Sequence, residues 1–115
     1  MNIQINGHRK SKDTRKTERF FSERRIPFHS RDLIEKPLSP REIENISRSV
    51  NPDLLIDTES AAYKKAGMEY MEYDPAEEVV EKPQLIRMPI VRNGPEATVG
   101  YAPDTWLRWI ADDKR

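Results

Sequence analysis

The residues best suited to chemistry lie in a basic segment near the amino terminus. Lys10, Lys12 and Arg15 surround Ser11, and the residues that follow are typical of a helix. The first turn of a helix offers free amide N–H groups and the positive end of its dipole, which together attract anions. The segment is therefore a candidate site for phosphate, sulfate or a carboxylate of a partner protein. A solvated basic loop is the plainer interpretation, and we prefer it.

Other chemistries are limited by residue types that are rare or missing. The 115 residues include no cysteine, which excludes disulfides, thiolate catalysis and zinc sites with sulfur ligands. The two histidines, His8 and His29, do not accompany a pattern of carboxylates, so no metal site is predicted. Ser11 is a weak nucleophile unless a base lies beside it.

The composition predicts a single folded domain. Hydrophobic residues make up 36% of the chain and occur in periodic clusters. No apolar run approaches the roughly 18 residues of a membrane span, and the amino terminus lacks the apolar core of a secretion signal. We therefore expect a cytoplasmic protein that contacts no membrane.

Charge is balanced over the whole chain but unevenly distributed along it. Residues 1–50 carry 12 Lys or Arg against 7 Asp or Glu, whereas residues 51–115 carry 8 against 13. Such a division makes one part of a surface attractive to anions and another part attractive to cations. The sequence pI of about 6.7 is below the basic range of nucleic-acid-binding domains, so no direct nucleic-acid contact is expected.

A β-α-β unit at the start of the chain is predicted to position the candidate residues. Residues 2–6 alternate apolar and polar side chains, as a strand does. Ser11 or Asp13 can cap a helix that runs to about residue 25, because their side-chain oxygens accept hydrogen bonds from its first amides. A second extended segment is predicted over 26–32.

Several short helices are predicted after this unit. The run Ser39-Pro40-Arg41-Glu42 is a capping box with proline at the first helical position. Leu38 and Ile43 are placed to form a hydrophobic staple around it. Further short helices are predicted to begin after Asn51, Thr58 and Asp74.

The chain is predicted to end in a hairpin and a helix. Residues 85–91 are an apolar run rich in β-branched side chains, and residues 98–101 form the returning strand. The turn between them contains Asn93-Gly94, a pair that favours tight hairpins. In the last helix the inward-facing residues are expected to be Trp106, Leu107 and Ile110.

The order of these elements and four stretches of sequence resemble the ArsC/Spx family, which includes arsenate reductases. The stretches are RKTERFFSERRIPF, EKPLSPREIENI, DTESAAYKKAG and, near the end, MPIVRNG followed by VGYAPDTW. The resemblance implies an α/β, thioredoxin-like fold in one domain over 1–115. Residues 1–37 and 84–115 would form its thioredoxin-like core, and residues 38–83 would form a helical insertion between the two halves.

The resemblance also implies which positions of this chain correspond to the family's chemistry. Counting back from Arg-Lys at 15–16, the catalytic cysteine of the family falls on Ser11, and the second cysteine of the Spx-type C-x-x-C falls on Thr14. The three arginines that surround the oxyanion in arsenate reductases fall on Asp57, Met88 and Tyr101. We therefore predict no catalytic residues at this site.

One structural feature of the family is expected to be kept. The family's proline falls on Pro89, and the resemblance implies that the Met88–Pro89 peptide bond is cis. A trans proline on an edge strand is the alternative.

The function that the resemblance implies is regulatory and depends on protein contacts. Spx-type proteins bind the α subunit of RNA polymerase, so this subunit is the expected partner, and no cofactor is expected. The contact surface would include Arg41, Arg48, Asn51 and Pro52. Because the cysteines of the Spx redox switch are missing, binding should not respond to oxidation.

Two other interpretations stay open. An arsenate-reductase-like or glutathione-dependent oxidoreductase or transferase would use the hydroxyl of Ser11 at the former cysteine position, with glutathione as its cofactor. Against a transferase, 115 residues are too few for the additional helical domain that such enzymes carry. The other interpretation is a structural subunit of a larger complex.

Overall fold

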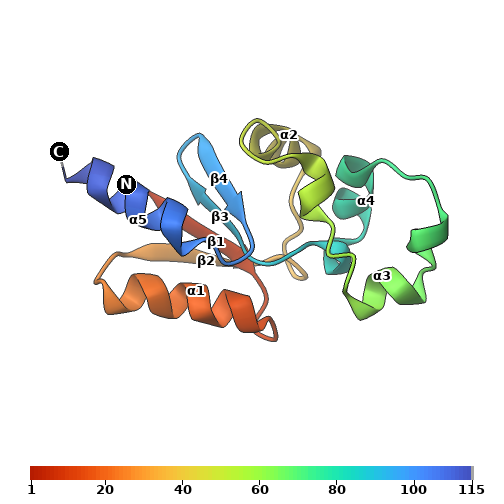
Figure 1. The fold of residues 1–115 in the computed structure, drawn as a ribbon, viewed down its shortest axis with the longest axis horizontal. Helices are drawn as coiled ribbons and strands as arrows, with labels where there is room; N and C mark the ends of the chain where they lie inside the picture. Colours follow the sequence, from red (N-terminus) through yellow and green to blue (C-terminus); the bar gives the residue numbers. More distant parts are fainter. Residues whose placement is uncertain (115) are drawn as a thin grey trace.

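A computed structural model describes residues 1–114 of the chain. Four strands form one mixed sheet in the order β2-β1-β3-β4 (Figure 1). The strands are β1 (Ile3–Gly7), β2 (Phe28–Asp32), β3 (Ile90–Asn93) and β4 (Glu96–Val99). β1 and β2 are parallel, whereas β3 is antiparallel to both β1 and β4. The sheet thus joins the beginning of the chain to its end.

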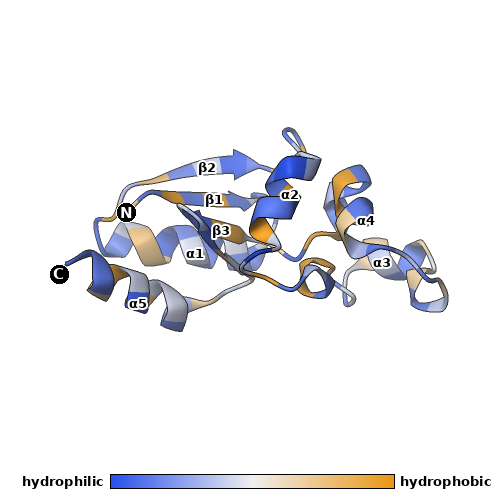
Figure 2. Ribbon diagram, turned by 90° about the horizontal axis from the view of Figure 1, so that it is seen from above, coloured by the Kyte–Doolittle hydropathy of each residue, from blue (hydrophilic) through white to orange (hydrophobic). Residues whose placement is uncertain are grey.

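Two longer helices cover one face of this sheet. α1 (Lys12–Glu23) connects β1 to β2, and α5 (Pro103–Asp113) follows β4. Both helices lie on the same side of the strands (Figure 2). Their apolar residues pack there against alternate residues of β1. This first core consists of Ile3, Ile5, Phe20, Phe21, Val91, Trp106 and Trp109.

The middle of the chain forms a second core from short helices, some of them 3-10 helices (η). These elements are α2 (Pro40–Ile46), η1 (Pro52–Leu55), α3 (Ala61–Lys65), η2 (Met68–Tyr70), α4 (Pro75–Glu81) and η3 (Pro83–Leu85). Their buried side chains pack together with Ile90 of β3. Ile90 and its neighbour Val91 point to opposite faces of the sheet, so β3 contributes to both cores.

The molecule is elongated, with extents of 47 × 27 × 23 Å. Figure 1 shows α5 and the start of β1 at one end and α3 and α4 at the other. This shape arises because the short helices lie largely beside the sheet and not over it. Among the described residues, no helix has the length and apolar character needed to cross a membrane.

The predicted capping box at the start of α2 is confirmed. The hydroxyl of Ser39 accepts from the amide of Glu42 at 3.1 Å, and the Glu42 carboxylate accepts from the amide of Ser39 at 3.0 Å. Leu38 and Ile43, the two residues of the staple, are both buried. Of the two candidate caps for α1, the structure shows that Ser11 is the one used.

The strand predicted over 85–91 begins later than expected. The chain first forms η3, and Ile86 then pairs with Ile56 in an isolated antiparallel bridge. β3 begins only at Ile90. The apolar run therefore reflects burial in the second core and not continuous strand pairing.

Two predictions about helices are also wrong. α3 begins after Ser60, whose hydroxyl caps it, and not after Thr58. In α5, Leu107 is 46% exposed, whereas Trp109 is 3% exposed and faces the first core. The indole N–H of Trp109 also donates to Glu96 of β4 at 2.7 Å.

Candidate functional site

An open cleft lies where the start of α1 meets the segment that enters β3 and the segment that leaves β4. Its volume is about 710 Å³. The resemblance assigns family chemistry to five positions, and four of them line this cleft: Ser11, Asp57, Met88 and Tyr101. These four are far apart in the sequence, so the fold brings them together.

Ser11 lines the cleft and is the N-cap of α1. Its Oγ accepts a hydrogen bond from the amide of Thr14 at 3.1 Å, which satisfies one of the free amides of the first turn. Within residues 1–114, no imidazole or carboxylate forms a hydrogen bond with this hydroxyl. The imidazole of His8 instead accepts from the amide of Lys10 at 3.0 Å. Ser11 therefore has no adjacent base to activate it.

Thr14, the fifth position, packs against the end of β1 and does not line the cleft. Its side chain is 5% exposed, and its Oγ1 has no hydrogen-bond partner among the described residues. Gly7 lies against it so closely that a Cβ there would be 2.3 Å from Thr14 Oγ1. The glycine thus permits the close approach of the helix and the strand.

Asp57 organises the turn that leads to α3. Its carboxylate accepts from the amide of Glu59 at 3.1 Å, and its own amide donates to the carbonyl of Leu85 at 2.8 Å. Asp57 also lines the cleft, at a position where the resemblance implies an arginine in arsenate reductases. A carboxylate at this position repels an oxyanion through Coulomb interaction.

Met88 and Tyr101 add bulk to the cleft without adding charge. The Met88–Pro89 peptide bond is cis, the isomer that the resemblance implies. Met88 packs against the second core. The ring of Tyr101 stands edge-on to Trp106, and the ammonium of Lys16 lies 4.2 Å from the centre of the same ring.

Arg87 is a residue of the cleft that the sequence analysis missed. The family position directly before Pro89 falls on Met88, and Arg87 is one residue earlier in the chain. Arg87 lines the cleft and donates to the carbonyl of Ile56 at 3.4 Å. The sequence shows an arginine near the proline, but its place in the cleft depends on the distant segment that contains Ile56.

The charges that line the cleft are balanced. Lys12 and Arg87 supply two cations, and Asp13 and Asp57 supply two carboxylates. The cleft is therefore not the strongly positive cradle that an oxyanion requires. In the described part of the chain, no three His, Asp or Glu side chains gather where they could hold a metal ion.

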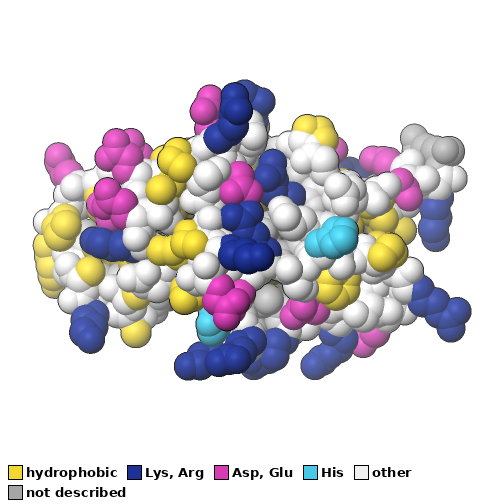
Figure 3. Space-filling view, turned by 180° about the vertical axis from the view of Figure 1, so that it is seen from behind, with side chains coloured by type: hydrophobic (Ala, Val, Ile, Leu, Met, Phe, Trp, Pro, Cys, Tyr) yellow, Lys and Arg dark blue, Asp and Glu magenta, His cyan; other side chains and the backbone are white. Residues whose placement is uncertain are grey.

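The four residues of the candidate anion site are not gathered in this cleft. Ser11 and Lys12 line it, but Lys10 does not, and the guanidinium of Arg15 donates to the carbonyl of Arg9 at 2.8 Å. Figure 3 shows Lys and Arg side chains spread along the lower edge of the molecule, where α1 lies. Anion binding at these four residues stays a prediction.

The predicted contact surface lies around α2 and the turn after it. Arg41 and Arg48 are exposed, and within residues 1–114 neither guanidinium forms an ion pair or a hydrogen bond. Asn51 is exposed as well and caps η1 by accepting from the amide of Asp53 at 3.0 Å. Pro52 is the first residue of η1. The two arginines are thus available to a partner, whereas Asn51 and Pro52 also shape the chain.

An ion pair fixes α2 to the sheet. Arg31 of β2 donates to the carboxylate of Glu42 at 2.6 Å. This hydrogen bond, with help from the amide of Ser39 and against the effect of partial burial, holds the pKa of Glu42 below its ordinary value. The contact surface on α2 is therefore held in place by a charged pair.

Comparison with known proteins identifies relatives of the chain. The model of the ArsC family matches residues 7–109. The global transcriptional regulator Spx of Bacillus subtilis is 31% identical over 102 residues, which cover 84% of this chain and 77% of that protein. Spx of Enterococcus faecalis, also a global transcriptional regulator, is 30% identical over 106 residues, which cover 88% of this chain and 80% of that protein.

Comparison of structures supports the same assignment at the level of fold. An arsenate reductase from Vibrio cholerae matches 94% of this chain and 97% of its own, with a TM-score of 0.79 and 19% sequence identity. The predicted thioredoxin-like α/β fold is thereby confirmed. The family match extends from the end of β1 into α5 and so includes all of the residues that line the cleft. The chain belongs to the ArsC family, as a member that contains no cysteine.

Proposed function

We propose that this chain is a non-catalytic ArsC/Spx-like protein that regulates through contacts with another protein. The observation that carries the proposal is the composition of the cleft around Ser11. The hydroxyl of Ser11 caps a helix and has no base beside it, and Asp57, Met88 and Tyr101 supply no cation. Reduction of an oxyanion needs a strong nucleophile and a strongly positive site, whereas here Ser11 has no activating base and two carboxylates offset the two cations of the cleft.

The α subunit of RNA polymerase is the proposed partner. Two relatives are named global transcriptional regulators, and the resemblance to Spx-type proteins implies this contact. On this chain, Arg41 in the first turn of α2 and Arg48 in the turn after its end present two exposed cations. Such a pair attracts a partner surface that carries carboxylates. A role in transcription also implies that the protein acts in the cytoplasm.

A binding experiment with the purified α subunit tests this proposal. The immobilised chain is expected to retain the subunit at tens of micromolar, and the double variant Arg41→Glu/Arg48→Glu is expected to lose it. Lys64→Glu/Lys65→Glu is the matched control, because it makes the same change of charge on α3. Failure of the natural chain to retain the subunit would contradict the partner. Equal retention by the Arg41/Arg48 variant would contradict the assigned surface.

A glutathione-dependent activity is the second candidate function. Lys12 and Arg87 place two cations in the cleft, and glutathione carries two carboxylates. Thermal-shift measurements with glutathione, phosphate and arsenate, followed by turnover assays, separate the two functions. The main proposal predicts no turnover, so robust reductase or transferase activity would overturn it.

A further inference from the structure

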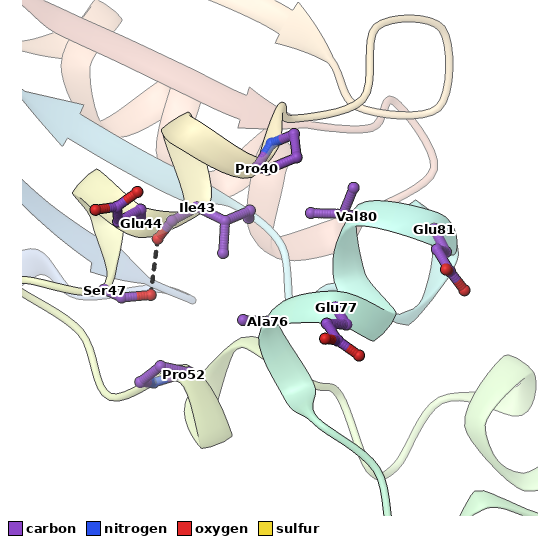
Figure 4. A pocket seen from close by; sticks show the side chains of 9 residues that line it. All are labelled: Pro40, Ile43, Glu44, Ser47, Pro52, Ala76, Glu77, Val80 and Glu81. Atoms are coloured by element: carbon purple, nitrogen blue, oxygen red, sulfur yellow. Dashed lines mark hydrogen bonds between the residues drawn. The ribbon is translucent and has the colours of Figure 1, made fainter.

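A groove between α2 and α4 shares no residue with the cleft around Ser11. It has a volume of about 700 Å³ and is open to solvent. Figure 4 shows the side chains of Ile43 and Val80 directed into the space between the two helices. The apolar residues that line the groove are Pro40, Ile43, Pro52, Ala76 and Val80.

The apolar part of the groove follows from the way α4 packs. Val79 is fully buried in the second core, whereas its neighbour Val80 is only partly buried. Ala76 precedes Val80 by four residues, so the two side chains form one short apolar stripe along the helix. This stripe faces Ile43 of α2 and leaves room for side chains of another molecule.

Three carboxylates surround this apolar surface. Glu44, Glu77 and Glu81 line the groove and are exposed. None of them forms an ion pair with a residue of the described chain, whereas Glu42 pairs with Arg31 and Glu78 pairs with Lys82. Glu77 and Glu81 are also four residues apart on α4, an arrangement in which like charges repel. The groove thus combines an apolar surface with uncompensated negative charge.

The geometry points to a docking site for a cationic amphipathic segment of a partner protein. Apolar side chains of that segment enter between Ile43, Ala76 and Val80, and its Lys or Arg side chains meet Glu44, Glu77 and Glu81. Acidic peptides and anionic lipid surfaces are disfavoured because the same carboxylates repel them. The inference rests on the proposed function only in treating the chain as a protein-binding module. The groove shares a single residue, Pro52, with the contact surface around Arg41 and Arg48.

A synthetic peptide tests the groove without a known partner. The probe is a fluorescent amphipathic helix of about 14 residues with Leu on one face and Lys elsewhere, and its titration is followed by fluorescence anisotropy. A second peptide carries Glu in place of Lys. The full chain is expected to bind the Lys peptide, to bind it more weakly as salt is raised, and to bind the Glu peptide at least about tenfold more weakly.

Variants of the chain distinguish binding of the peptide in the groove from non-specific attraction between opposite charges. Glu44→Gln/Glu77→Gln/Glu81→Gln is expected to weaken binding of the Lys peptide at least about tenfold. Glu59→Gln/Glu69→Gln/Glu72→Gln removes the same charge from exposed positions outside the groove and is expected to bind as the natural chain does. Ala76→Trp fills the apolar stripe and is expected to block binding while all three carboxylates stay in place. Circular dichroism checks that each variant is folded.

Several results would overturn the inference. These are no binding of the Lys peptide at about 100 micromolar, equal binding of the two peptides, or unchanged binding by the groove variants. The α-subunit experiment is separate from this one. If the chain retains the α subunit but does not bind the peptide, the docking site in the groove is contradicted and the proposed function stands. If it binds the peptide but does not retain the α subunit, only the polymerase contact is contradicted.

Discussion

At the scale of single residues, the start of α1 combines a helix cap with an environment that favours negative charge. Ser11 Oγ accepts from the amide of Thr14, and the dipole of a 12-residue helix points its positive end at the same atom. A sulfur atom at this position would experience the same amide and dipole, which lower the pKa of a thiol. Two features that stabilise a thiolate are therefore present at a position that holds a serine.

The variant Ser11→Cys tests this environment directly. The thiol pKa is expected to lie below the ordinary value of about 8.5, because the Thr14 amide and the helix dipole stabilise the thiolate. Since the chain has no other cysteine, the ultraviolet absorbance of the thiolate against pH reports on this group alone. Ser22→Cys, near the other end of α1, is the control and should not show a lowered pKa. Equal pKa values in the two variants would contradict the account of Ser11.

The sequence predicted Ser11 but not Arg87, and the difference has a physical reason. A helix cap is a local pattern of a few residues, so Ser11 could be found from its neighbours alone. The position of Arg87 depends on contacts with a distant segment, because its amide donates to the carbonyl of Leu55 at 2.8 Å and Ile86 pairs with Ile56. Nothing near Arg87 in the sequence specifies those contacts.

At the scale of secondary-structure elements, α2 is held by a local capping box and by distant contacts of Glu42 with Arg31 of β2 and, at 3.9 Å, with Arg92 of β3. The Ser39–Glu42 capping box fixes its start, and the pair between Arg31 and Glu42 joins it to β2. Glu42 therefore serves the helix cap and the tertiary contact at the same time. Loss of its charge should loosen the docking of α2 and leave the cap in place.

The variant Glu42→Gln isolates the charge, because glutamine can also complete a capping box. The pKa of Glu42 is lowered by Arg31, so the stability that the pair contributes is present above about pH 4.5 and is lost as the pH falls through the lower pKa of the folded state. Glu42→Gln should therefore cost about 1 kcal/mol at neutral pH and nothing at strongly acidic pH.

Urea unfolding at both pH values measures the effect. Glu44→Gln, on the same helix and without an ion pair, is the control and should show no such change with pH. A loss of stability in Glu42→Gln that persists in acid would contradict the role of the charge.

The predictions of element boundaries and helix faces that were wrong depend on which side chains are buried, and the local sequence pattern does not specify that. An apolar run such as 85–91 is typical of a strand, but its first residues enter the second core through η3 and an isolated bridge. Leu107 and Trp109 of α5 are both apolar, but Trp109 is the one that packs in the first core, where it also donates to Glu96. The capping box needed no such distant information and was predicted correctly.

At the scale of the whole molecule, the sheet connects two cores of different composition, most directly through β3. Ile90 belongs to the second core and Val91 to the first, and both tryptophans lie in the first. If the sheet couples the cores, damage to one core should lower the stability of the other. The sequence predicts a single domain, in which residues 38–83 are inserted between 1–37 and 84–115. In a single domain the two hydrophobic cores are expected to unfold together.

The variant Ile46→Ala tests the coupling from the side that has no tryptophan. Ile46 is 1% exposed in the second core, so its truncation should cost about 2–5 kcal/mol. Tryptophan fluorescence and circular dichroism should both report this loss, at the same denaturant midpoint. Leu107→Ala, at an exposed position, should have little effect. A fluorescence midpoint that Ile46→Ala leaves unchanged would show that the two cores unfold independently.

The central claim is that the chain acts by binding and not by thiol chemistry. Isothermal titration calorimetry with the purified α subunit of RNA polymerase tests it most directly, using the chain before and after treatment with the thiol oxidant diamide, which is removed before the titration. We predict binding at tens of micromolar or tighter, with the same dissociation constant for both samples, because the chain has no cysteine to oxidise. No binding in that range, or an affinity that changes with the treatment, would contradict the account.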